Sequence, residues 1–445
     1  MRQTLLLFFI AFTTLLQSQE WTYLFNGKNL EGWNKKGGEA VYSIEKGVLV
    51  GKTVANTPNT FLCTNKEYGD FIFELELLVD GMNSGVQFRS LSKADYQNGR
   101  VHGYQMEVDP SPRSWSGGIY DEARRDWLYI PDINTRAKSA FKIGKWNKYR
   151  IEAIGTTIRT WINGVPIAHL IDDMTDKGFI ALQVHSIGKD DTPGKQIKWK
   201  NVRIQTKNLK PTPLDDCPVI NLIDNTLSKQ EQKQGFDLLF SDNSFDKWRG
   251  VHSTAKPNKR WSINEGVVMV SKSDGSETGN DIVTKEKYGA FELVFDFKLT
   301  PGANSGVKYF VDEQYDSGGK SGIGLEYQIL DDELHPDAQM GAVGNRTLAS
   351  LYDLIPSEKL TSRFTRKVGT WNQGRVIVKP DNTVQHWLNG FKVVEYQRNS
   401  NIYKALVARS KYVNYNGFGS ASEGHILLQD HGDEVHYKNV KIRKL

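Results

Sequence analysis

Two short stretches of the chain, GYQMEVD and GLEYQIL, each place one amide and one carboxylate two residues apart. The pairs are Gln105 with Glu107, and Glu326 with Gln328. Side chains alternate between the two faces of a strand, so each pair shares one face while its apolar neighbours occupy the other. A carboxylate can act as a base or a metal ligand, and an amide can bond the hydroxyls of a sugar. A solvated strand face without a function would show the same pattern.

A second polar pair, of Gln-x-His type, follows further along each half of the chain. It consists of Gln183 and His185 in the first half, and of Gln429 and His431 in the second. The two side chains of such a pair again share one strand face. A single strand histidine is usually structural, but this pair occurs in both halves, each time downstream of a carboxylate–amide pair. The histidine of such a site could serve as a base or as a metal ligand.

The segments that follow the carboxylate–amide pairs are polar and rich in ring-bearing side chains. They are residues 109–129 in the first half and 331–354 in the second. Long loops with aromatic and arginine side chains, carried on a rigid sheet, are typical of ligand sites. A solvated crossover loop is the alternative. An insertion before the second Gln-x-His pair contains RSKYVNYNGFGSASE and could form a lid or a subsite wall. The candidates from these segments are Asp121, Arg124, Arg125, Trp127, Arg346, Tyr352 and Lys411.

The polar pairs recur because the chain is an internal duplication. FNGKNLEGW matches FSDNSFDKW, KEYGDFIFELEL matches EKYGAFELVFDF, and NSGVQF matches NSGVKY, in the same order. Each half closes on KNVRI or KNVKI. Repeats have to be recognised first, because a missed repeat leads to the wrong fold. We expect two domains, residues 20–206 and 235–445, and between them a linker, residues 207–234, with one short helix.

Short runs that alternate in period two predict strands throughout both halves. FIFELELLV and FELVFDFKL are two such runs, and Asn-Gly at 163–164 and at 389–390 signals hairpin turns. Many short strands joined by turns indicate an all-β protein made of two tandem antiparallel sandwiches of jelly-roll type. Helix is expected to be scarce.

Composition and charge exclude several classes of partner. A net charge of +5 on 445 residues is small, and no cluster of Lys and Arg resembles a nucleic-acid footprint. Residues 1–18 have the pattern of a signal peptide, and no later stretch is apolar enough to span a bilayer. We therefore expect an exported protein, periplasmic or secreted. Its two cysteines, Cys63 and Cys217, do not make a disulfide framework, and neither is expected to be a catalytic thiol.

Several motifs are specific enough to suggest a family. They are NSGV, GYQMEVD with the following GGIYDEARRDWL, the two Asn-Gly hairpins, and the terminal GFGSASEGHILLQDHGDEVHYKNVKIR. Together they resemble the 3-keto-disaccharide hydrolase domain family, in two tandem copies that cover nearly the whole chain after the leader. The resemblance implies a concanavalin A-like lectin/glucanase sandwich in each half. The copies differ, because LQVHSIG in the first stands where the second has LQDHGDE, and the amide–carboxylate order is reversed.

The resemblance also implies a reaction, the cleavage of 3-keto-glycosides. A sugar oxidised at C3 has an acidic C2–H, because the enolate delocalises onto the ketone. Loss of that proton expels the group at C1, and addition of water then gives net hydrolysis. The site needs a base, a donor to the enolate oxygen and a donor to the leaving oxygen. The catalytic candidates are His431, Glu326, Arg346, His185, Glu107 and Arg124, and the substrate-binding candidates are Gln105, Asp121, Arg125, Trp127, Gln183, Gln328, Tyr352, Lys411 and Gln429.

No cofactor is identified by the sequence. A divalent metal ion held by histidine and carboxylate could polarise the ketone, but the residues do not define its ligands. Direct hydrolysis by two carboxylates would need a second acid, for which Asp109, Asp121 or Asp331 is available. The expected partner is an oligosaccharide or 3-keto-glycoside substrate. The alternatives are a pair of non-catalytic, lectin-like glycan-binding modules, or one catalytic and one binding domain.

Of the two halves, the sequence favours the second for catalysis. Asp430, His431 and Gly432 give it the fuller terminal motif, and its aromatic insertion could close over a substrate. Closure matters because an enolate survives only where water is excluded and donors are fixed beforehand. The first half nevertheless carries its own Glu107 and His185.

Overall fold

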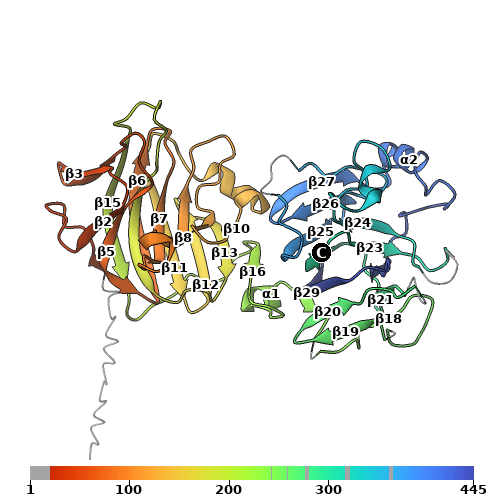
Figure 1. Ribbon diagram of the computed structural model, residues 1–445. Helices are drawn as coiled ribbons and strands as arrows, with labels where there is room; N and C mark the ends of the chain where they lie inside the picture. Colours follow the sequence, from red (N-terminus) through yellow and green to blue (C-terminus); the bar gives the residue numbers. More distant parts are fainter. Residues whose placement is uncertain (1–20, 242, 258, 276–279, 316–320, 360–363) are drawn as a thin grey trace, which may run out of the picture.

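The protein folds into two β-sandwiches that lie side by side, with a connecting segment between them (Figure 1). The computed structural model describes residues 21–241, 243–257, 259–275, 280–315, 321–359 and 364–445. The expected leader, residues 1–18, lies outside the described residues. The prediction of an all-β fold with two tandem jelly-roll sandwiches is confirmed. None of the described helices is long and apolar enough to cross a membrane.

The first sandwich has two sheets, here called its backing sheet and its site sheet. The backing sheet contains β1 (Thr22–Tyr23), β3 (Val41–Glu45), β4 (Val48–Lys52), β6 (Phe71–Val79), β11 (Asn147–Ile154), β12 (Thr157–Ile162), β13 (Val165–Ile171), β15 (Gln196–Gln205) and β16 (Val219–Asn221). The site sheet contains β2 (Trp33–Gly37), β5 (Thr60–Tyr68), β7 (Ser84–Leu91), β8 (His102–Val108), β9 (Ile119–Glu122), β10 (Asp126–Tyr129) and β14 (Gly178–Val184). In the site sheet the strand order is β10-β9-β8-β7-β14-β5-β2. Short 3-10 helices are η1 (Gln97–Gly99), η2 (Pro131–Ile133) and η3 (Thr135–Ser139).

The second sandwich repeats this arrangement. Its backing sheet contains β17 (Asp237–Leu238), β19 (Trp261–Asn264), β20 (Val267–Val270), β22 (Phe291–Leu299), β25 (Asn372–Val378), β26 (Thr383–Leu388), β27 (Phe391–Gln397) and β29 (Val435–Lys444). Its site sheet contains β18 (Trp248–Gly250), β21 (Ile282–Thr284), β23 (Asn304–Val311), β24 (Leu325–Leu330) and β28 (His425–Leu428), in the order β18-β21-β28-β23-β24. η4 (Pro336–Gln339) and α2 (Asn401–Val407) lie in its connections.

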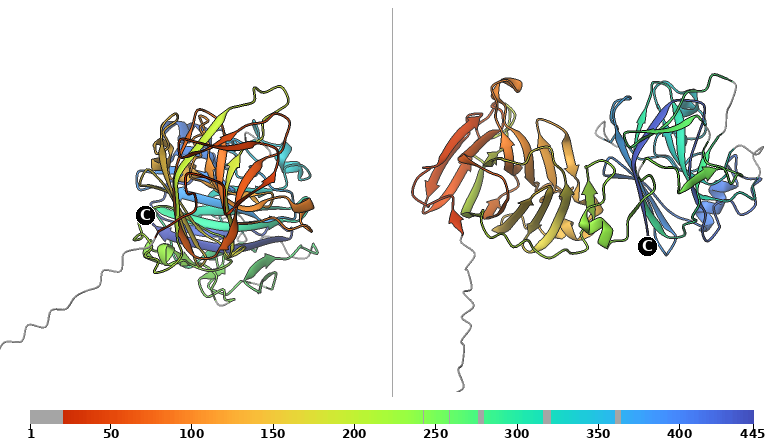
Figure 2. Two further views of the ribbon diagram at one scale, coloured as in Figure 1. Left: turned by 90° about the vertical axis from the view of Figure 1, so that its left-hand side faces the viewer. Right: turned by 90° about the horizontal axis from the view of Figure 1, so that it is seen from below.

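The two sheets of each sandwich face one another (Figure 2), and alternating side chains build the core between them. Phe71, Phe73 and Leu75 of β6 are almost fully buried there, whereas Glu74 lies on the other face of the strand with basic partners. The predicted Asn-Gly hairpin between β12 and β13 is confirmed, because Asn163 and Gly164 have φ of 51° and 82°. Two positive φ values in succession suit the right-handed twist of the strands that such a turn connects.

The connecting segment is ordered and belongs to both domains. β16 pairs in parallel with β13 of the first domain. The expected short helix is α1 (Lys229–Lys233), and Glu231 in it forms a buried ion pair with Lys441 of β29, at 2.5 Å. Cys63 and Cys217 are both free and buried, and burial raises the pKa of each thiol to about 12.

Candidate functional site

The four strand residues singled out in the first half lie together in one pocket. This first-domain pocket has a cavity volume of about 200 Å³ on the site sheet. The two polar pairs of the first half therefore face one cavity. The pocket is lined by Asn59, Asn83, Arg100, Gln105, Glu107, Arg113, Tyr120, Glu122, Trp127, Gln183 and His185.

Glu107 is the buried carboxylate of the first-domain pocket, with only 4% of its surface exposed. Burial raises its pKa to about 7, although hydrogen bonds from Asn83 and Gln105 favour the ionised form. These bonds run from Asn83 Nδ2 to Oε1 at 2.6 Å and from Gln105 Nε2 to Oε2 at 2.9 Å. A carboxylate with a pKa near 7 is half ionised at neutral pH and suits a general base.

A glycine opposite the pair makes room for it. Gly85 of β7 faces Glu107 in the strand register, and a Cβ at Gly85 would lie 2.3 Å from Cδ of Gln105. The next residue on that face, Gln87, donates to Gln105 Oε1 at 2.7 Å. The glycine of the repeated NSGV motif therefore lets the polar side chains lie flat along the sheet.

His185 lies at the end of β14 and brings an imidazole to the same pocket. Its Nδ1 is 2.7 Å from the carbonyl oxygen of Ser186. Since only a protonated Nδ1 can donate to a carbonyl, Nε2 of the neutral ring keeps its lone pair. Glu122 lies near it, with a pKa raised by burial, and is held by Arg100 at 3.1 Å. The pocket thus combines a base, an imidazole and an acid–arginine pair.

Two side chains of the first-domain pocket have polar atoms without a partner among the described residues. Gln183 is 1% exposed, and neither Oε1 nor Nε2 of its amide has a hydrogen-bond partner there. The Nε1 of Trp127 is also buried and unpartnered within the described chain. Buried polar groups are nearly always bonded, so such groups in a pocket point to a polar ligand.

Asp121, Arg124 and Arg125 do not line the first-domain pocket, contrary to expectation. Asp121 lies between Tyr120 and Glu122 on β9, so period-two alternation turns it to the interior. There its two oxygens accept from Arg124 at 2.7 Å and from Arg125 at 2.6 Å. Arg125 also pairs with Asp172 at 2.6 Å. The two arginines neutralise buried carboxylates.

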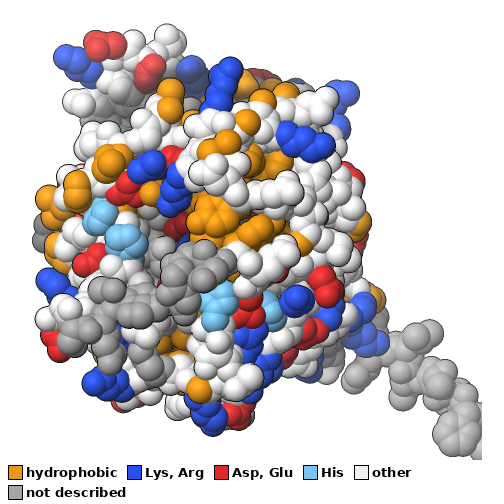
Figure 3. Space-filling view, turned by 90° about the vertical axis from the view of Figure 1, so that its right-hand side faces the viewer, with side chains coloured by type: hydrophobic (Ala, Val, Ile, Leu, Met, Phe, Trp, Pro, Cys, Tyr) orange, Lys and Arg blue, Asp and Glu red, His pale blue; other side chains and the backbone are white. Residues whose placement is uncertain are grey.

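The second domain has a pocket at the equivalent place on its site sheet. This second-domain pocket has a cavity volume of about 250 Å³ and lies at the end of the molecule that Figure 3 faces, where hydrophobic side chains gather in a hollow. The insertion forms part of its wall, through Lys411, Tyr412 and Tyr415. Its described lining residues are Lys308, Ser321, Gly322, Ile323, Gly324, Glu326, Lys411, Tyr412, Tyr415 and Gln429.

The reversed amide–carboxylate order has a definite consequence for charge. The strand register puts Glu326 opposite Lys308 and Gln328 opposite Gly306, which is the position that Glu107 holds in the first domain. Burial raises the pKa of Glu326, and Lys308, Lys411 and His431 oppose this rise. The second domain therefore has an amide where the first has its buried carboxylate, and its own carboxylate lies among cationic side chains.

Arg346 and Tyr352 do not line the second-domain pocket but form a network beside it. Arg346 donates to Asp353 at 2.7 Å and to Asp337 at 2.9 Å, and the Tyr352 hydroxyl donates to Asp337 at 2.7 Å. Lys411 Nζ lies 4.2 Å from the centre of the Tyr352 ring. These contacts place Lys411 against the pocket. Arg346 is held by two carboxylates, which leaves its guanidinium less free for an oxyanion.

Among the described residues, one group could hold a metal ion. His335, His431 and Asp433 each offer a ligand atom, all within 4.8 Å of one another. However, Nδ1 of His335 accepts a hydrogen bond from the Asp337 amide at 3.2 Å, so the proton of the neutral ring is on Nε2. To bind a cation, His335 would have to give up this bond or its Nε2 proton, whereas Asp433 accepts from the Asn304 amide at 3.0 Å through Oδ2 and keeps its other oxygen. These residues form a candidate cation site in the second domain.

Several residues of the first-domain pocket were not predicted from the sequence. Asn83 belongs to the NSGV motif, and its recurrence in both halves was a usable signal. Tyr120 and Glu122 could have been found by applying period two to GGIYDE, which puts them on the face opposite to Asp121. Arg100 and Arg113 come from connections, where no periodicity fixes the direction of a side chain.

Comparison with known proteins identifies the family. A family model described as the 3-keto-alpha-glucoside-1,2-lyase-like domain matches residues 20–205 and again residues 235–443. The chain belongs to this family. The family resemblance predicted from the motifs is confirmed, and each copy of the domain contains one of the two pockets.

The chain is also similar to individual known proteins. A protein from Bacteroides thetaiotaomicron named 3-keto-disaccharide hydrolase is 32% identical over 234 residues, which cover 47% of this chain and 79% of that protein. A crystal structure from Parabacteroides distasonis, of a protein described provisionally as a glycosyl hydrolase, has 29% sequence identity and a TM-score of 0.44. It covers 50% of this chain and 99% of that chain.

Proposed function

We propose that the protein cleaves 3-keto-glycosides, and that the first-domain pocket carries the chemistry. The observation that supports this proposal most is the convergence of buried Glu107, the unpartnered amide of Gln183 and His185 in one cavity. The relative named 3-keto-disaccharide hydrolase supports the substrate class. The signal-peptide pattern of residues 1–18 supports export to the periplasm or the medium.

Each group in the pocket suits one step of an elimination followed by hydration. Glu107 removes the C2 proton, and the electron pair moves toward the C3 ketone to give an enolate. The amide N–H of Gln183 is available to donate to the enolate oxygen, which it can do without breaking another bond. As the C1–O bond breaks, His185 in its doubly protonated form donates the proton on Nε2 to the departing oxygen, while Nδ1 keeps its bond to the Ser186 carbonyl. Water then adds to the resulting enone, so the net reaction is hydrolysis.

We infer a different role for the second domain, the binding of glycan without cleavage. Gln328 stands there at the register position of Glu107, and an amide cannot accept a proton as a base. Tyr412 and Tyr415 instead offer aromatic side chains at the second-domain pocket, and Gln429 Oε1 is buried without a partner among the described residues. This arrangement supports one catalytic and one binding domain.

Activity should rise with pH through about 7 if Glu107 is the base. The pKa of this carboxyl in the free protein is raised to about 7, so protonation at lower pH removes the group that must accept the C2 proton. We expect log kcat/KM to increase by about one per pH unit as the pH approaches that value from below. The measurement is the initial rate of aglycone release, corrected for spontaneous elimination at each pH. A profile that is flat across neutral pH would exclude Glu107 as the base.

The matched pair of substitutions His185→Ala and His431→Ala tests which domain acts. His185→Ala should lower turnover of a 3-keto-glycoside by about 10²-fold, because the leaving oxygen loses its proton donor. His431→Ala should leave turnover intact, since His431 is exposed and lies in the other domain. Turnover and glycoside binding are measured for both variants after circular dichroism shows retained fold. Loss of turnover in His431→Ala alone would assign catalysis to the second domain. Intact turnover in both variants would mean that neither histidine is needed for cleavage, whereas binding without turnover in the native protein would favour the lectin-like alternative.

A further inference from the structure

The first-domain pocket lies next to a larger groove between the two domains. Arg113 lines both cavities. This interdomain groove has a cavity volume of about 860 Å³. The first domain contributes Arg113 and Trp115 to its wall, and the second domain contributes Phe364, Trp387, Phe391 and Lys392.

The volumes of the two cavities suit two different parts of a glycoside. Ligand pockets typically have volumes of about 300–1,000 Å³, and the first-domain pocket, at about 200 Å³, is smaller than this range. The pocket alone is therefore suited to the reacting sugar ring and little more. The interdomain groove, at about 860 Å³, has room for the rest of a larger glycoside.

Aromatic side chains from both domains line the groove, and together they are here called its aromatic floor. The ring centres of Trp115 and Phe391 are 5.8 Å apart across the domain boundary, and Phe364 stacks on Phe391 at 4.0 Å. Arg113 lies over Trp115, 4.5 Å from its ring centre, and is fixed by Asp109 at 2.5 Å. An apolar floor beside fixed polar groups suits a ring that has one flat apolar face.

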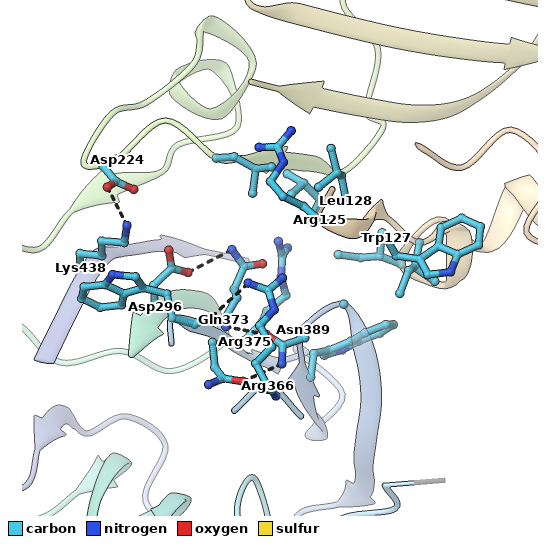
Figure 4. A pocket seen from close by; sticks show the side chains of 18 residues that line it. Arg125, Trp127, Leu128, Asp224, Asp296, Arg366, Gln373, Arg375, Asn389 and Lys438 are labelled. Carbon is cyan, nitrogen blue, oxygen red and sulfur yellow. Dashed lines mark hydrogen bonds and ion pairs between the residues drawn. The ribbon is translucent and has the colours of Figure 1, made fainter. Parts of the chain in front are cut away.

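The domain boundary is packed, so the groove has a defined shape. Trp115 belongs to the same buried cluster as the core of the second domain. Figure 4 shows the neighbouring pocket at this boundary, where Arg125 and Leu128 of the first domain lie across from Asp296 and Arg375 of the second. Trp127 lines both that pocket and the first-domain pocket. The second domain is thus held against the rim of the proposed catalytic site.

We propose that the second domain completes the leaving-group end of the first-domain site. The 3-keto sugar occupies the first-domain pocket, and the ring attached to its C1 oxygen lies in the interdomain groove on the aromatic floor. That ring has a flat apolar face, as do both a second pyranose and an aromatic aglycone. The inference rests on the proposed function and adds to it a leaving-group subsite that is built by residues of both domains.

The test fills the groove from its exposed rim. Lys392 is exposed on the second domain, so Lys392→Trp should fold normally and obstruct the groove. Lys404→Trp on α2 is the matched control, since Lys404 is also exposed and lies outside the groove. Three 3-keto-glucosides are compared in the intact protein, with methyl, glucosyl and aryl leaving groups. KM and kcat are measured from product release, and Kd of the corresponding unoxidised glucosides is measured by calorimetry.

We expect Lys392→Trp to raise KM and Kd by about tenfold for the glucosyl or aryl compound and to leave the methyl compound unchanged. A response of the glucosyl compound alone identifies a sugar subsite, and a response of the aryl compound alone identifies an aglycone subsite. Equal effects on all three compounds, or effects no larger than those of Lys404→Trp, would overturn the inference. If Kd responds but the native protein turns over none of the compounds, the subsite stands and the proposed reaction fails. If the native protein neither binds nor cleaves any of them, both fail.

Discussion

Replacement of Glu107 by glutamine is expected to lower kcat for 3-keto-glycoside cleavage by about 10²–10⁴-fold, the range that a positioned general base contributes. The amide has nearly the shape of the carboxylate but cannot accept the C2 proton. Its oxygen can still accept the bond from Asn83 Nδ2, now 2.6 Å from Oε1, so the pocket should keep its form. KM should therefore change far less than kcat. The measurement is the rate of aglycone release at saturating substrate.

Glu326→Gln in the second domain is the matched control. The two carboxylates lie on equivalent strands, β8 and β24, and are both buried. Turnover should survive Glu326→Gln, whereas glycoside binding by the second domain should weaken. If Glu326→Gln is instead the variant that stops turnover, the catalytic domain is the second, as the sequence alone favoured. If Glu107→Gln retains full kcat, proton abstraction does not use this carboxylate.

Strand periodicity was sufficient to predict which polar residues of the first domain face one pocket. Gln105 with Glu107, and Gln183 before His185, occupy alternate positions on neighbouring parts of one sheet, and the internal repeat marked both pairs. The fold was predictable for the same reason, because each strand shows its buried face in period two. The alternation of side chains along each strand is enough to set which of them face the pocket and which face the core.

The sequence showed which residue types the loops contain, but not the direction in which their side chains point. Asp121 belongs to a strand whose alternation turns it inward, and Arg124 and Arg125 follow it to neutralise its charge. These three residues therefore form a buried ion-pair network, whereas Arg113, Glu122 and Trp127 of the same segment line the first-domain pocket. Charge content by itself does not separate these two cases, because both require arginine beside carboxylate.

Contacts between the domains could not be predicted from either repeat. Trp115 lies in a loop of the first domain, and its partner Phe391 lies 276 positions later in the sequence, at the start of β27. The segments at the equivalent positions of the other repeat do not make this contact between domains. A groove made by joining two copies therefore exists only at the tertiary level, and no pattern within one copy encodes it.

The largest stability effect is expected where the connecting segment meets the second domain. Glu231 of α1 is 1% exposed in its side chain, and Lys441 of β29 is 6% exposed, with 2.5 Å between Nζ and Oε1. Although burial opposes the ionisation of Glu231, Lys441 holds the pKa of this carboxyl below its ordinary value. Lys441→Met should cost about 3–5 kcal/mol in the free energy of unfolding, because it leaves a buried carboxylate without its cation. Urea unfolding followed by tryptophan fluorescence gives this value.

The pH dependence of that loss separates a charge effect from a packing effect. In the native protein the pKa of Glu231 is lowered, so its stabilising contribution is present at neutral pH and is lost as the pH falls. In Lys441→Met the unpaired carboxyl of Glu231 should have a raised pKa and should take up a proton on folding. The stability difference between the variant and the native protein should therefore become smaller as the pH falls. The double variant Lys441→Met with Glu231→Gln should regain most of the lost stability at pH 7, because no buried charge remains. A loss that is the same at every pH, and that Glu231→Gln does not relieve, would mean that Lys441 stabilises the domain through the packing of its methylene chain and not through its charge.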